Sequence, residues 1–108
     1  MDILEQWNNM EKPYKTLVYF IKKLAGEDGG ITYDELTHKF LQNVEEDYKG
    51  NGRAINKYLP TAKKRTLLKE DDYYPGTVRI VYAGSKAKEL INAIPDVIET
   101  WAEENSFK

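Results

Sequence analysis

The chain has 108 residues, of which 41% are hydrophobic and 31% charged, and a formal net charge of -2 at pH 7. This size and composition indicate one globular domain with a modest core. The absence of cysteine excludes a disulfide framework, a cysteine nucleophile and a thiolate metal site, and it fits the reducing cytoplasm. Since no apolar stretch approaches the length of a membrane span or a signal peptide, we expect a cytoplasmic protein.

The first part of the chain predicts helices. A weak apolar repeat indicates a short helix over residues 3–10, and a stronger one predicts a helix over residues 13–25 that begins with a proline suited to a first turn. Thr32 and Glu35 have the spacing of a capping box, so a further helix is expected from Thr32 to about residue 44.

A third apolar stripe follows after two glycines. Its members have helical spacing and are Ile55, Tyr58, Leu59 and Ala62. The helix is expected to begin at Asn51 or Gly52. Pro60 lies inside the stripe, and a proline in a helix interior costs about 3 kcal/mol. The helix is therefore expected either to end near Leu59 or to kink.

The pattern then changes to that of strands. Residues 66–70 and 77–82 are rich in β-branched and large apolar side chains, and the segment between them has turn chemistry, so a β-hairpin is expected. In its second strand the alternating apolar side chains are Val78, Ile80 and Tyr82. Ser85 is the expected cap of a following helix, and Pro95 either kinks this helix or starts another.

The expected fold class is therefore mainly α with a small β-hairpin. The segment "INKYLPTAKKRTLLKEDDYYPGTVRIVYAGSKAKELI" resembles the recognition-helix-to-wing segment of winged helix-turn-helix regulators of the MarR and PadR kind. "YLPTAKKRTLL" and "VYAGSKAKELI" stand where that family has LxxLxxxGLL and YxLTxxGxxLL, with Arg65-Thr66 in place of the turn glycine. The resemblance implies one winged-helix domain over residues 1–108, with a core over 13–94 and terminal helices over 1–12 and 95–108 as candidate dimerisation elements.

Residues 49–69 carry seven basic side chains and no acidic one. In the resembling family the third helix enters the DNA major groove, where Arg and Asn read base edges and Lys contacts phosphates. The candidate DNA-binding residues are Lys49, Asn51, Arg53, Asn56, Lys57, Lys63, Lys64, Arg65, Lys69 and Arg79. Arg53 and Asn56 are expected to contact bases, and residues 63–65 to contact phosphates. The alternative is that the basic segment is merely a solvated face.

A second subunit is also expected. Apolar residues continue at helical spacing into the C-terminal segment, and a tryptophan lies near each end of the chain. The candidate dimer interface consists of Trp7, Ile94, Val97, Ile98 and Trp101. The alternative is that both tryptophans pack within one chain.

The sequence thus predicts a protein that binds double-stranded DNA, either as a homodimeric transcriptional regulator or as a plasmid partition (centromere-binding) protein. The alternative is a winged-helix module that contacts another protein without binding DNA, an interpretation favoured by the acidic wing residues Glu70, Asp71 and Asp72. No enzyme activity, metal or cofactor is expected, because His38 is the sole histidine and the carboxylates form no recognisable acid–base set.

Overall fold

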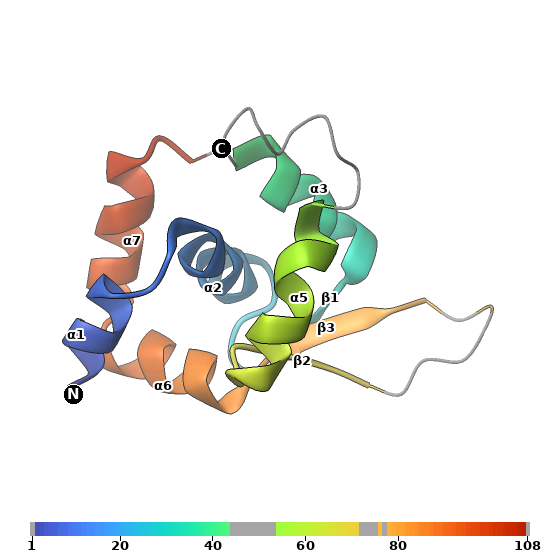
Figure 1. Ribbon diagram of the computed structural model, residues 1–108, viewed down its shortest axis with the longest axis horizontal. Coiled ribbons are helices and arrows are strands. Elements are labelled where there is room, and N and C mark those ends of the chain that lie inside the picture. The colour runs from blue at the N-terminus through green and yellow to red at the C-terminus, as the bar shows by residue number, and fades with distance from the viewer. Residues whose placement is uncertain (1, 44–53, 72–75, 77, 108) are drawn as a thin grey trace.

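A computed structural model describes residues 2–43, 54–71, 76 and 78–107. The elements in chain order are α1 (Ile3–Asn8), α2 (Lys12–Leu24), β1 (Gly30–Thr32), α3 (Tyr33–Asn43), α5 (Ala54–Lys64), β2 (Leu68–Glu70), β3 (Ile80–Ala83), α6 (Ser85–Ala93) and α7 (Pro95–Glu104) (Figure 1). The predicted fold class, mainly helical with a small β-hairpin, is confirmed. From α2 to β3 the chain has three helices followed by a hairpin, with the strand β1 inserted between α2 and α3.

Helix α2 lies at the centre of the molecule, with α3 and α5 on one side and α1, α6 and α7 on the other (Figure 1). Its side chains Leu17, Val18 and Ile21 are fully buried. The helix begins with Pro13 in its first turn and ends within one residue of the predicted boundary. A single core is therefore organised around α2, as the shared apolar stripes require.

A short strand that the sequence did not predict, β1, precedes α3. It pairs antiparallel with β3, and β3 also pairs with β2, so the sheet order is β1-β3-β2. Gly30 allows this close pairing, because a Cβ there would lie 2.5 Å from the side chain of Ile80. The predicted cap is confirmed at the end of β1, where Thr32 Oγ1 accepts a hydrogen bond from the Glu35 N–H at 3.1 Å.

The core-facing side of β3 differs from the alternating set seen in the sequence. Val81 and Ala83 are buried, whereas Ile80 and Tyr82 are half-buried and Val78 is 70% exposed. Successive side chains in a strand point to opposite faces of the sheet. The predicted residues are one position away from the buried ones, so they lie on the face that points away from the core. The predicted alternation therefore marks the outer side of the hairpin.

Helix α5 buries the predicted stripe of four side chains: Ile55, Tyr58, Leu59 and Ala62. Its predicted start at Asn51 or Gly52 lies outside the described residues. The helix does not end near Leu59 but continues through Pro60 to Lys64. Pro60 is exposed, and its missing N–H removes one backbone hydrogen bond from the helix.

Helix α6 begins without the predicted serine cap. Ser85 is its first residue, and the N-cap position is occupied by Gly84, which has no side chain to cap the helix. A Cβ at Gly84 would lie 2.1 Å from the carbonyl oxygen of Thr66, so the tight approach of the α5–β2 connection selects glycine there. Pro95 starts a separate helix, α7, rather than kinking α6.

The two tryptophans pack within the chain. Trp7 is 1% exposed, and its ring meets that of Trp101 edge to face with 5.6 Å between the centroids. The ammonium of Lys15 lies over both rings, at 5.4 Å and 5.7 Å from their centroids, and burial lowers its pKa. Ile98 is also fully buried. Trp7 and Ile98 thus lie in the chain's own core, contrary to the prediction that they form part of a dimer interface.

The remaining interface candidates, Ile94, Val97 and Trp101, are half-buried, and a dimer built on them stays a prediction. Of the helices in the described ranges, none combines the length and apolar character that a membrane crossing requires.

Candidate nucleic-acid interface

The outward face of α5 is basic. Lys57 and Lys64 are seven residues apart, which brings them into line on a helix, and both are exposed opposite the buried stripe. Asn56 and Lys63 form a second exposed row with the same spacing, closer to the hairpin. No acidic side chain lies on α5. The helix therefore presents cations and one amide to solvent on the side where the sequence predicted a DNA contact.

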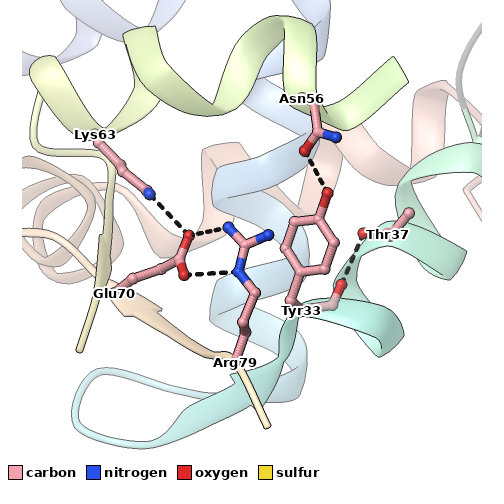
Figure 2. Close-up of polar contacts among 6 residues, drawn as sticks. All are labelled: Tyr33, Thr37, Asn56, Lys63, Glu70 and Arg79. Carbon is pink, nitrogen blue, oxygen red and sulfur yellow. Dashed lines mark hydrogen bonds and ion pairs between the residues drawn. The ribbon is translucent and has the colours of Figure 1, made fainter. Parts of the chain in front are cut away.

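The row nearer the hairpin is tied to the hairpin by one carboxylate. Glu70 on β2 is 8% exposed and accepts two hydrogen bonds from Arg79, at 3.1 Å from Nε and 2.7 Å from Nη2 (Figure 2). Lys63 Nζ lies 2.8 Å from the same carboxylate. The hydrogen bonds from Arg79, aided by Lys63 and opposed by burial, lower the pKa of Glu70, and the carboxylate in turn raises the pKa of Arg79.

Arg79 also contacts the first residue of α3. Its guanidinium lies over the ring of Tyr33 with 3.9 Å to the ring centroid, a favourable cation–π contact. The Tyr33 hydroxyl donates a hydrogen bond to Oδ1 of Asn56 (Figure 2). A continuous chain of contacts therefore links Lys63, Glu70, Arg79 and Tyr33 back to Asn56, from one end of α5 to the other.

Two further predicted residues lie beside other parts of the molecule. Arg65, just after α5, lies 3.1 Å from the Glu11 carboxylate and stacks 4.7 Å from the centroid of the Tyr14 ring. The Glu11 backbone N–H and the Arg65 guanidinium lower the pKa of Glu11. Lys69 lies over the ring of Tyr82, where a hydrogen bond with Asp71 raises the pKa of the tyrosine.

The structure thus divides the predicted site. On α5 and on the side of α5 that faces the hairpin, it brings together five of the predicted residues: Asn56, Lys57, Lys63, Lys64 and Arg79. It places Arg65 toward α2, and Lys69 on the strand face that carries Tyr82. Lys49, Asn51 and Arg53 lie outside the described residues.

Sequence reasoning missed Tyr33 as part of this site and treated Glu70 only as an acidic residue of the hairpin that favours a protein partner. The spacing of Leu68 and Glu70 carried a usable signal. Residues two apart in a strand share a face, and Leu68 faces the core. A buried carboxylate on that face needs partners of opposite charge, which Arg79, just before the opposing strand, and Lys63 supply.

In the part of the chain that the structure describes, no group of three or more His, Asp or Glu side chains has an arrangement that could hold a metal ion. His38 is exposed on α3, with its Nε2 3.1 Å from the side-chain nitrogen of Gln42.

Comparisons with known proteins place this geometry in no family. No family model matches the chain, and no solved structure matches it. Among curated proteins, ribonuclease Y of Campylobacter hominis is 32% identical over 94 aligned residues, in an alignment that covers 85% of this chain and 18% of ribonuclease Y. The chain thus spans about a fifth of the length of the curated protein that it matches, a share too small to show family membership.

Proposed function

We propose that the protein binds double-stranded DNA through the outward face of α5. The observation that carries the proposal is the exposed, acid-free row of α5, with Lys57 and Lys64 aligned opposite the core stripe and Asn56 beside them. Lysines on such a face neutralise phosphates and release counterions, and an amide at the same face can read a base edge. A transcriptional regulator and a plasmid partition protein both use this chemistry.

A homodimer fits the proposal, because two copies would present two such helices to a palindromic site. The half-buried side chains of α7, Val97 and Trp101, together with Ile94, supply the candidate contact. The oligomeric mass is therefore measured alongside DNA binding.

The test is a titration of the protein against selected duplex DNA at several salt concentrations. Replacing both Lys57 and Lys64 by Gln should lower the slope of log K against log salt by roughly one per lost phosphate contact and per subunit. The matched control is Lys23→Gln, which removes an exposed lysine from α2 and should leave the slope unchanged. A double variant that binds like the wild type at every salt concentration would contradict the proposal.

A second candidate, a module that contacts another protein without binding DNA, is favoured by the carboxylate partners of the site. Glu70 pairs with both Lys63 and Arg79, and Glu11 pairs with Arg65, which reduces the positive field. Wild-type protein that fails to bind any duplex in a salt-dependent way would favour this function. Because the curated relative is named a ribonuclease, RNA of the same sequence belongs in the titration as a competitor.

A further inference from the structure

We infer that Tyr33 is a positioning residue, which holds the Asn56 amide ready to donate a hydrogen bond to a purine base. This inference rests on the proposed DNA-binding function and identifies the base chemistry that the α5 face would read. It arises from the contact between the Tyr33 hydroxyl and Asn56 Oδ1 (Figure 2), which joins the start of α3 to the exposed row of α5.

Tyr33 is fixed at both its backbone and its ring. Its backbone N–H donates to the Arg79 carbonyl oxygen at 2.9 Å, and its own carbonyl oxygen accepts from the Thr37 hydroxyl at 2.7 Å. The Arg79 guanidinium covers the ring at 3.9 Å from its centroid. Since Glu70 holds this guanidinium with two hydrogen bonds, the hydroxyl of Tyr33 has a defined position before any ligand arrives.

The fixed hydroxyl orients the amide of Asn56. An asparagine side chain has an acceptor oxygen and a donor NH₂ group. The oxygen accepts a hydrogen bond from the Tyr33 hydroxyl, whereas the nitrogen of this exposed side chain has no partner among the described residues. The orientation therefore presents a donor to the solvent side of α5.

A donor on this face matches purines best. In the major groove adenine and guanine both present N7 as an acceptor and guanine adds O6, whereas thymine has the single acceptor O4 beside its methyl group and cytosine presents a donor. A pre-oriented donor avoids the loss of side-chain freedom on binding. We therefore expect Asn56 to favour a purine at one position of the site, and Tyr33 and Arg79 to support that preference without touching the DNA.

The experiment compares four proteins, which are the wild type, Tyr33→Phe, Asn56→Ala and the double variant, against duplexes that carry each base at each position of the selected site. Asn56→Ala should abolish the purine preference at one position, a loss of about 2-fold to 12-fold for a single hydrogen bond. Tyr33→Phe should lower the same preference about twofold to fivefold, with an unchanged salt slope. The double variant should behave like Asn56→Ala alone, because Tyr33 acts through Asn56.

Arg79→Lys separates positioning from a phosphate contact. Lysine keeps the charge but loses the planar, two-point contact with Glu70 and the stacking on Tyr33. If Arg79 supports Tyr33, Arg79→Lys should reduce the purine preference as Tyr33→Phe does and leave the salt slope unchanged. Additive effects of Tyr33→Phe and Asn56→Ala, or a full purine preference in Tyr33→Phe, would overturn the inference while DNA binding itself stands.

A measurement on the free protein gives a readout independent of DNA. The side-chain amide resonances of Asn56 should shift in Tyr33→Phe, because their hydrogen-bond partner is gone. The amide of Asn92, which donates to Glu27 elsewhere in the molecule, is the internal control and should not move. Unchanged Asn56 resonances would overturn the inference even if no duplex is bound, so its failure and that of the proposed function are distinguishable.

Discussion

Glu70 is expected to anchor the hairpin to α5, and Glu70→Gln tests this. The substitution keeps the shape of the side chain but replaces one oxygen by an NH₂ group that faces the Arg79 guanidinium. Three contacts are affected, at 3.1 Å and 2.7 Å to Arg79 and 2.8 Å to Lys63. Breaking a buried ion pair costs about 3–5 kcal/mol. Because the Arg79 and Lys63 side chains are 31% and 41% exposed and regain water, we expect a loss of about 1.5–3 kcal/mol.

The pH dependence of this loss has a defined sign. The pKa of Glu70 in the folded protein is lowered from its ordinary value of 4.5. The stability contributed by its carboxylate is therefore complete above the ordinary pKa and disappears as the pH falls through the folded pKa. In urea unfolding followed by circular dichroism, the gap between wild type and Glu70→Gln should be largest near neutral pH and close in acid.

The control for Glu70→Gln is Glu89→Gln, which removes an exposed carboxylate that pairs with Lys86 three residues away. It should change the free energy of unfolding by less than about 0.5 kcal/mol. A Glu70→Gln protein within about 0.5 kcal/mol of the wild type at neutral pH, or a gap that persists in acid, would refute the anchoring role.

Two other stability predictions use the same urea assay. Leu59→Ala should lower the free energy of unfolding by about 2–5 kcal/mol, since Leu59 is 4% exposed in the α5 stripe. The control is Leu4→Ala, at an exposed site on α1. A loss for Leu59→Ala below about 0.5 kcal/mol would show that the stripe is misread. Thr66→Gly should raise the free energy of unfolding by about 0.5–1 kcal/mol. At Thr66 φ is +58°, a conformation in which a β-branched residue is strained by about 1–2 kcal/mol. Glycine removes this strain but loses more backbone entropy on folding, which offsets part of the gain. Thr66→Val keeps the strain, and equal effects of Gly and Val would contradict this explanation.

The helical part of the fold could be predicted because its signals are local. The spacing of apolar residues in α2 and α5 is set by one turn of helix, and Thr32 and Glu35 sit together at one helix start. The strand β1 gave no comparable signal, since it has three residues and is defined by pairing with β3, about fifty residues later in the sequence. Periodicity needs several repeats to be visible, and a three-residue strand supplies too few.

Thr66 shows how a departure from a pattern can be informative. The resembling family has a turn glycine where this chain has Arg65-Thr66. The backbone there ends α5 with the hydrogen bonds of a Schellman motif, a helix end that usually has glycine. The Leu67 N–H donates to the Ala62 carbonyl at 2.8 Å, and the Thr66 N–H donates to the Lys63 carbonyl at 3.0 Å. Helix α5 thus ends in a turn with a positive φ at Thr66, a conformation that glycine adopts more readily than threonine.

The charge of the candidate site could not be predicted from the basic segment alone. Seven cations within residues 49–69 suggest a uniformly positive surface. Folding, however, brings carboxylates from outside that segment to two of its members, Glu70 to Lys63 and Glu11 to Arg65. Partners so placed depend on tertiary contacts, which a one-dimensional count does not contain. The exposed face of α5 is therefore a better predictor of phosphate contact than the number of basic residues, and Lys57 and Lys64 should affect the salt slope more than Lys63 and Arg65 do.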